Sequence, residues 1–304
     1  MSHMPSSPAE SRRERAARRA GEFPPSPEPL RVPVFDSHTH LDLTVQEAGI
    51  PGGQSTDPVR ADPVDALLVA AAKTGVDRIV QVGVDVASSR WSAALAARHD
   101  GVLAAVAIHP NEAPRLSDLD EALREIEALA AEPRVRGVGE TGLDSFRTGD
   151  AGRAAQEASF RAHIAIAKRH AKALIIHDRD AHADVLRVLD SEGAPDTVVL
   201  HCFSGDAEFA AECVRRGYYL SFAGTVTFAS AGTLREAAAL TPPEQIMVET
   251  DAPYLTPVPY RGRPNASYLI PVTVRALAAV RGTDLDALCA AISANGERVF
   301  GGWR

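Results

Sequence analysis

Short apolar segments alternate with longer segments of helical periodicity from Val32 onward, and this alternation is the strongest constraint on how the chain folds. Eight segments are short, apolar and rich in β-branched residues, which is typical of buried strands. They cover residues 32–41, 77–84, 103–109, 136–144, 173–179, 197–203, 219–224 and 246–252. Segments rich in Ala, Leu and Arg separate them, near residues 62–75, 88–99, 118–131, 154–171, 181–192, 206–216 and 230–240.

Eight consecutive strand–helix units in a chain of 304 residues predict an α/β fold, a (β/α)8 or TIM barrel. Two more helices are predicted at residues 272–281 and 284–299, so an extra helix extends the barrel at its C-terminus. A doubly wound open sheet is the structural alternative. It is disfavoured because no Gly-x-Gly-x-x-Gly turn follows the first strand to hold a dinucleotide.

The first 31 residues differ in composition from the rest of the chain. They are rich in Arg, Ala, Pro, Ser and Glu, and residues 23–29 include four prolines. Because such a composition cannot bury a core, we expect a disordered Arg- and Pro-rich tail over residues 1–31. Residues 32–304 are then expected to form a single TIM-barrel domain.

Charge and apolar content limit the classes of function. The net charge is −8, and residues 1–31 carry six Arg against four Glu, so the remainder is near −10. The negative net charge argues against a protein that binds nucleic acid through a broad basic surface. It argues less against a hydrolase, because bound cations can make the mouth of an active site locally positive. No apolar run is long enough to span a bilayer, and no hydrophobic signal core is present. We therefore expect a cytoplasmic protein without membrane contact. Short loops and the lack of an evident exposed apolar repeat favour a monomer.

Polar residues within the apolar segments gather at the carboxyl ends of the predicted strands. The first strand carries His38 and His40, whose i, i+2 spacing puts both imidazoles on one face. Later strands end in His109, Glu140 with Asp144, His177, His201, and Glu249 with Asp251. Six strands thus deliver His, Glu or Asp to the rim where barrel enzymes place their chemistry. Taken singly, these residues have ordinary explanations, such as His109 capping a strand or Asp144 bonding a loop.

Converging imidazoles and carboxylates predict a metal site. Burying several such groups unpaired would cost several kcal/mol, which a bound cation offsets. Histidine and carboxylate ligands without thiolate favour Zn, Mn, Ni or Co, whereas Mg takes fewer imidazoles. The three cysteines, Cys202, Cys213 and Cys289, lack the close spacing of a zinc knuckle or a disulfide framework. Because the candidate ligands outnumber those of one tetrahedral ion, two divalent metal ions are expected.

Five ordered motifs on this rim resemble the TatD family of metal-dependent deoxyribonucleases, which belongs to the amidohydrolase-like barrels. The motifs occupy residues 36–42, 139–144, 176–181, 201–205 and 249–257, and the resemblance covers nearly the whole chain after the tail. It implies that His38, His40 and Asp251 hold one metal. It implies that His177 and His201 hold a second metal, and that the carboxylate of Glu140 bridges the two.

The resemblance implies a 3′–5′ exodeoxyribonuclease with DNA, single-stranded or at 3′ ends, as its substrate. Two ions can activate a shared water for in-line attack on a phosphodiester, and Asp251 is placed to take the proton while Glu140 bridges the ions. Arginines on the same rim are candidates for the phosphate oxygens, because guanidinium offers paired donors. The expected substrate contacts are Arg179, Arg261, Arg263, Tyr254 and His109.

Three positions depart from the usual family pattern. Ser145 followed by Phe146 stands where an aromatic residue is usual, and Asp178 stands where Ser is common. Residues 265–267 read Asn-Ala-Ser instead of Asn-Glu-Pro. None of these is an expected ligand, so metal binding should persist while substrate contacts differ, since an aromatic at the mouth can stack a terminal base.

Other hydrolytic functions fit the same rim. Related barrels that act on amides, lactones or phosphotriesters use a carboxylated lysine on the fourth strand, but the only lysines are Lys73, Lys168 and Lys172, and Glu140 fills the bridging place. A D-aminoacyl-tRNA deacylase remains open, because an activated water attacks acyl carbon as readily as phosphorus. A catalytically idle metal-binding protein is disfavoured because all six ligand positions are present.

Overall fold

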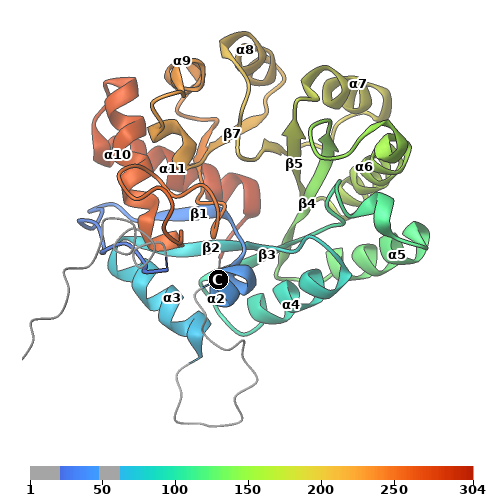
Figure 1. The fold of residues 1–304 in the computed structure, drawn as a ribbon, viewed down its shortest axis with the longest axis horizontal. Coiled ribbons are helices and arrows are strands. Elements are labelled where there is room, and N and C mark those ends of the chain that lie inside the picture. Colours follow the sequence, from blue (N-terminus) through green and yellow to red (C-terminus); the bar gives the residue numbers. More distant parts are fainter. Residues whose placement is uncertain (1–20, 48–61, 304) are drawn as a thin grey trace, which may run out of the picture.

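The computed structural model describes residues 21–47 and 62–303, and its centre is one eight-stranded parallel sheet whose strands follow sequence order (Figure 1). The strands are β1 (Val34–Thr39), β2 (Val76–Val82), β3 (Val102–Val106), β4 (Val135–Asp144), β5 (Ala173–Arg179), β6 (Val198–Leu200), β7 (Tyr219–Phe222) and β8 (Ile246–Val248). A parallel bridge between Thr39 and Ala252 brings the two ends of the sheet together. The predicted TIM barrel is therefore confirmed.

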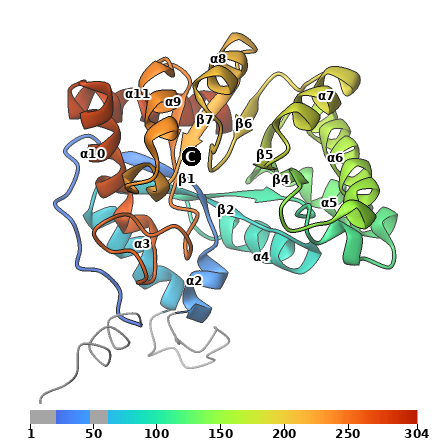
Figure 2. The same ribbon diagram turned by 45° about the horizontal axis from the view of Figure 1, so that its top comes forward.

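Helices surround the strands on the outside, as Figures 1 and 2 show. They are α2 (Leu41–Glu47), α3 (Pro63–Lys73), α4 (Val86–Ala96), α5 (Leu119–Ala130), α6 (Asp150–His170), α7 (His182–Glu192), α8 (Ala207–Arg215), α9 (Gly232–Leu240), α10 (Ile270–Arg281) and α11 (Leu285–Phe300). All nine predicted helices are present, including the two after β8. The short helix α2 was not predicted, and its first residue, Leu41, lies at the predicted end of the first strand.

The last helix, α11, covers the junction between β1 and β8. Phe35 on β1 is fully buried there against Phe300 and Trp303, with ring centroids 6.2 and 6.0 Å away. A Cβ atom on Gly296 of α11 would lie 2.4 Å from the Phe35 ring, so only glycine allows the helix this close to the strand. The tight contact fixes β1, which carries His38 and leads directly into His40, the first two candidate ligands.

The predicted boundary of the disordered tail at residue 31 does not hold. Within residues 21–31, the Arg263 guanidinium donates to the carbonyls of Glu22 and Phe23, and the Tyr268 hydroxyl donates to the Pro24 carbonyl at 2.5 Å. Leu30 is buried in the core. Phe23 and Leu30 supply apolar anchors that the average composition concealed. Residues 1–20 lie outside the described part of the chain.

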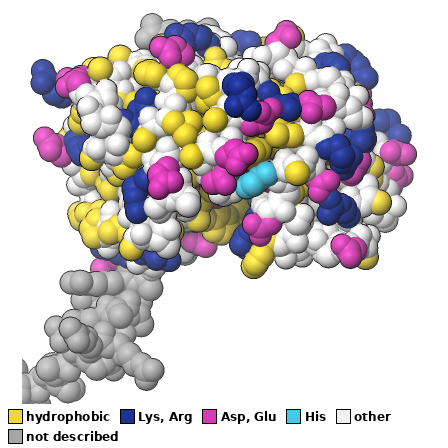
Figure 3. All heavy atoms as spheres, turned by 90° about the horizontal axis from the view of Figure 1, so that it is seen from above, with side chains coloured by type: hydrophobic (Ala, Val, Ile, Leu, Met, Phe, Trp, Pro, Cys, Tyr) yellow, Lys and Arg dark blue, Asp and Glu magenta, His cyan; other side chains and the backbone are white. Residues whose placement is uncertain are grey.

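Among the helices of the described residues, none combines the length and apolar character needed to cross a bilayer. The three cysteines are free thiols, with Cys213 and Cys289 buried in α8 and α11. Acidic and basic side chains are interspersed on the face of the described residues shown in Figure 3.

The contact between the N-terminal segment and the barrel can be tested with Tyr268→Phe, which removes only the hydroxyl that donates to Pro24. We expect the free energy of unfolding in urea to fall by about 1 kcal/mol in the full-length protein. In a chain that begins at residue 32 the same substitution should have almost no effect, because its acceptor is gone. Equal losses in the two backgrounds would contradict this contact.

Candidate metal centre

The six expected ligands converge at the carboxyl ends of the strands, with the carboxylate of Glu140 at the centre. Its Oε1 atom lies 3.6 Å from Nε2 of both His38 and His40. Its Oε2 atom lies 3.2 Å from Nδ1 of His177 and 2.8 Å from Nε2 of His201. One carboxylate thus faces two pairs of imidazoles, one pair at each oxygen.

Glycines allow β4 to place Glu140 there. A Cβ atom on Gly139 would lie 2.4 Å from the carbonyl oxygen of Ile175, and one on Gly142 would lie 2.1 Å from the carbonyl oxygen of His177. Both glycines also have positive φ angles, +155° and +134°. Because side chains fit at neither position, β4 approaches β5 closely only with glycine on both sides of Glu140.

Asp251 joins His38 and His40 from the far end of the sheet. Its Oδ1 atom lies 3.5 Å from Nε2 of His40 and 4.0 Å from Nε2 of His38. Two backbone hydrogen bonds fix this arrangement, from Asp251 to the His38 carbonyl at 2.9 Å and from His40 to the Ala252 carbonyl at 2.8 Å. Asp251 itself adopts a left-handed backbone conformation with φ of 52°. These three side chains form one group whose ligand atoms lie within 4.8 Å of one another.

His109 also faces Glu140, although it was expected only as a substrate contact. Its Nε2 atom lies 3.6 Å from Glu140 Oε2, and it groups with Glu140 and His177. Its Nδ1 atom accepts a hydrogen bond from the Asn111 backbone at 3.0 Å, so the neutral ring carries its proton on Nε2. Burial lowers the pKa of His109 to about 4. The ring is therefore neutral near pH 7 and presents a donor to the site.

Three of the four predicted histidine ligands have an acceptor for the ring nitrogen that faces away from Glu140. The pairs are His40 Nδ1 with the Val82 carbonyl at 3.0 Å, His177 Nε2 with Asp144 at 3.2 Å, and His201 Nδ1 with Glu249 at 3.2 Å. Such bonds fix the tautomer and aim the other nitrogen at a metal. The only role considered for Asp144 was a bond to a loop, which it makes to the backbones of Phe146 and Arg147, and no role was expected for Glu249. Their positions in the ligand-bearing motifs could have indicated these orienting roles, because Asp144 follows Glu140 by four residues and Glu249 precedes Asp251 by two.

Electrostatics favour ionised carboxylates at the centre. Burial opposes ionisation of Glu140, but the charge of His201 and the hydrogen bonds of His177 and His201 outweigh it and hold the pKa of Glu140 well below its usual range. Asp251 behaves alike, because its hydrogen bond with His40 and the charge of His201 lower its pKa against the effect of burial. The site therefore presents two carboxylates as anionic donors at neutral pH.

The residues present fit a divalent metal. His38 is fully buried, and neither of its ring nitrogens has a hydrogen-bond partner among the described residues. Glu249 Oε2 is likewise buried without a hydrogen-bond partner in that part of the chain. Burial raises the pKa of the neighbouring Cys202 thiol well above its usual value, so this sulfur stays protonated and is a poor ligand. Imidazole and carboxylate donors match ions such as Zn and Mn.

Of the expected substrate contacts, Arg263 is used elsewhere. Its guanidinium donates to the carbonyls of Glu22 and Phe23, so it holds the N-terminal segment instead of facing the site. Arg261 lies over the ring of Phe228, with its guanidinium carbon 4.2 Å from the ring centroid. Tyr254 is half exposed on the loop after β8.

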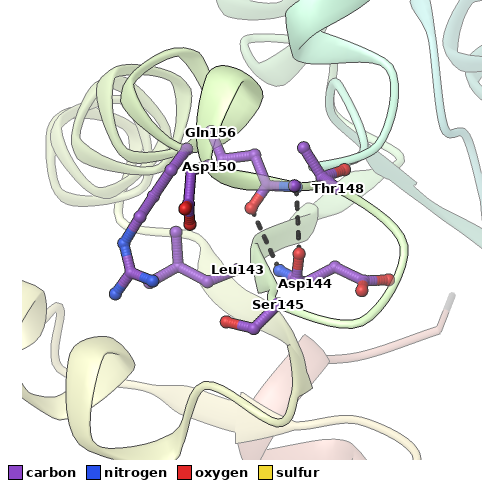
Figure 4. Close-up of a pocket in the computed structure, with 8 residues that line it drawn as sticks. Leu143, Asp144, Ser145, Thr148, Asp150 and Gln156 are labelled. Atoms are coloured by element: carbon purple, nitrogen blue, oxygen red, sulfur yellow. Dashed lines mark hydrogen bonds between the residues drawn. The ribbon is translucent and has the colours of Figure 1, made fainter.

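Arg179 lies over an aromatic ring from the neighbouring loop. Its guanidinium carbon is 4.1 Å from the centroid of the Phe146 ring. A small cavity of about 60 Å³ lies beside this loop, lined by Leu143, Asp144, Ser145, Thr148, Gly149, Asp150, Arg153 and Gln156 (Figure 4). Gln156 accepts a hydrogen bond from the Asp144 backbone at 3.1 Å there and so supports the end of β4.

The loop after β8 is held by Asn265 despite its departure from the usual Asn-Glu-Pro pattern. The Asn265 amide donates to the carbonyls of Thr250 at 3.0 Å and Tyr254 at 2.5 Å. It is fully buried. The loop that carries Asp251 is therefore anchored without the glutamate.

Residues 35–301 match the family model described as TatD related DNase. The chain belongs to the TatD family. It is 46% identical over 275 residues to an uncharacterized metal-dependent hydrolase TatD of Mycobacterium tuberculosis, an alignment that covers 89% of this chain and 99% of that protein. The resemblance inferred from the motifs is thereby confirmed, and the protein is a metal-dependent hydrolase of this family.

Two further relatives bear on the fold and the chemistry. A TatD protein of Citrobacter rodentium, named as a 3′–5′ ssDNA/RNA exonuclease, is 35% identical over 245 residues, covering 78% of this chain and 91% of its own. The crystal structure of YJJV, a TatD homologue of Escherichia coli, has a TM-score of 0.77 at 26% identity and covers 88% of this chain and 97% of that one.

The orienting role of Glu249 predicts the effect of Glu249→Gln. This change keeps the size of the side chain but weakens its bond to His201, so we expect the affinity for Mn or Zn to fall by about 10- to 100-fold. Competition with a chelating dye measures this directly. Glu236→Gln on the exposed face of α9 is the matched control and should bind metal as the wild type does. An unchanged affinity in Glu249→Gln would contradict the role.

Proposed function

We propose that this TatD protein is a 3′–5′ exodeoxyribonuclease that hydrolyses phosphodiester bonds of single-stranded DNA or of 3′ ends. The observation that carries the proposal is the position of Glu140, whose two carboxylate oxygens face separate pairs of imidazoles. A bridging carboxylate between two ligand sets is the arrangement that a two-metal hydrolytic site requires. The name of the Citrobacter relative supports a nucleic acid as the substrate.

In this proposal His38, His40 and Asp251 would hold one divalent ion, His177 and His201 would hold the second, and Glu140 would contact both. Ions bound there would supply Lewis acidity, which makes a water molecule more acidic and offsets charge on the phosphate oxygens. The buried acceptors behind the histidines keep each ring in the tautomer that a ligand needs. The ions are Zn, Mn, Ni, Co or Mg.

Asp251 would act as the base and Glu140 as the bridge. The lowered pKa of Asp251 keeps its carboxylate ionised, and its left-handed backbone, bonded to His38, holds it against the first pair of imidazoles. It can therefore accept a proton from the attacking water. His109 would donate from Nε2 to a phosphate oxygen, since its Nδ1 is occupied as an acceptor. Arg179, Arg261 and Tyr254 remain candidates for contacts with the substrate.

The proposal predicts that the purified protein with Mn or Mg shortens single-stranded DNA from its 3′ end. Asp251→Asn should lower the rate at least about 100-fold, as expected for loss of a general base. Metal content measured on the same sample should show ions still bound. Asp190→Asn on the outer helix α7, where the carboxylate pairs with the surface residue Arg216, is the matched control and should retain full activity.

Two assays on the same samples separate the hydrolytic functions. Hydrolysis of D-aminoacyl-tRNA without shortening of DNA would reassign the protein to ester cleavage. A wild type that cleaves neither substrate in Mn or Mg, or an Asp251→Asn variant as active as the wild type, would contradict the proposed mechanism.

A further inference from the structure

Phe146 is the most exposed large hydrophobic side chain among the described residues, at 65%. It is the second residue after the end of β4 and lies at the same rim of the barrel as Glu140. A phenylalanine left so open to water stabilises the fold little, because its ring is not removed from solvent. The exposed ring at this rim is therefore available to bind another molecule.

Arg179 covers one face of the Phe146 ring, and its guanidinium carbon lies 4.1 Å from the ring centroid. The Arg179 side chain has no ion pair or hydrogen bond with any other residue in the described part of the chain. It therefore keeps its positive charge and its N–H donors available. A cation against one face leaves the opposite face of Phe146 for another flat group.

The pair lies next to the candidate metal ligands. In the register of β4 and β5, Gly142 pairs with His177 and Asp144 pairs with Arg179. Arg179 therefore follows His177 by two residues on β5, on the same face of the strand. This places the guanidinium one step outward from His177.

The loop that carries Phe146 is also tied to His177 through a single carboxylate. Oδ1 of Asp144 accepts hydrogen bonds from the backbones of Phe146 at 2.9 Å and Arg147 at 2.7 Å, while Oδ2 lies 3.2 Å from Nε2 of His177. Asn111 donates to the same Oδ2 at 2.9 Å. These hydrogen bonds hold the loop that carries the Phe146 ring in place, which lowers the entropic cost of binding a ligand on the ring.

We propose that Phe146, backed by Arg179, is the surface on which the unpaired base of the 3′-terminal nucleotide, the one to be removed, stacks. Stacking on an aromatic ring recognises the π face that every base shares, and the free guanidinium donors can reach the adjoining phosphate. This inference rests on the proposed exonuclease function. It gives a physical reason for the proposed substrates, because only an unpaired base, in a single strand or at a frayed end, can stack on the ring.

The test compares two single-stranded oligonucleotides that differ only in the base of the nucleotide to be removed, which is present in one and replaced by an abasic residue in the other. Phe146→Ala should lower kcat/KM on the first by about 5- to 150-fold, the range for losing one base–aromatic contact. It should leave kcat/KM on the abasic strand unchanged. Phe146→Tyr keeps a stacking ring and should match the wild type on both.

Each other outcome has a distinct meaning. Equal losses on the two strands would show that the ring acts through the fold or the metal ligands and would overturn the stacking role while the exonuclease function stands. Unchanged kinetics in Phe146→Ala on both strands would overturn it as well. A wild type that cleaves neither strand in Mn or Mg would overturn the exonuclease function and the stacking role together.

Discussion

The buried carboxylate of Glu140 is the constraint on which the rest of this molecule depends. It is almost fully buried, and isolated burial of a charge would cost several kcal/mol. The imidazoles of His38, His40, His177 and His201 surround it and supply the compensating interactions. Bringing groups from β1, β4, β5 and β6 to one carboxylate requires a closed ring of strands, which the TIM barrel provides.

The surrounding residues hold this arrangement in position. Glycines at 139 and 142 let β4 pass close to β5, and Gly296 lets α11 press against Phe35 on β1. Asp144 and Glu249 hold His177 and His201 from behind. Asp144 also accepts the backbone N–H of Phe146, so the candidate metal ligands and the candidate stacking surface share one support. If the ring of Phe146 stacks a base as proposed, substrate binding and ligand orientation would be coupled through the single side chain of Asp144.

Much of the fold and of the candidate site could be predicted from the sequence, because both follow from local patterns. The strand–helix alternation is local, and the candidate ligands stand at strand ends that a parallel barrel necessarily brings together. Contacts across long separations could not be predicted. The use of Arg263 to hold residues 22 and 23, and the bond from Glu249 to His201, depend on how distant loops meet. The tautomer of His109 depends on one backbone hydrogen bond that no composition or spacing reveals.

The most direct test of the two-ion account is a crystal structure of the protein grown with Mn, with anomalous scattering used to locate the ions. The account predicts two anomalous peaks roughly 4 Å apart. One should lie among His38, His40 and Asp251, the other between His177 and His201, with Glu140 contacting both. A single peak at full occupancy, or peaks away from Glu140, would contradict it.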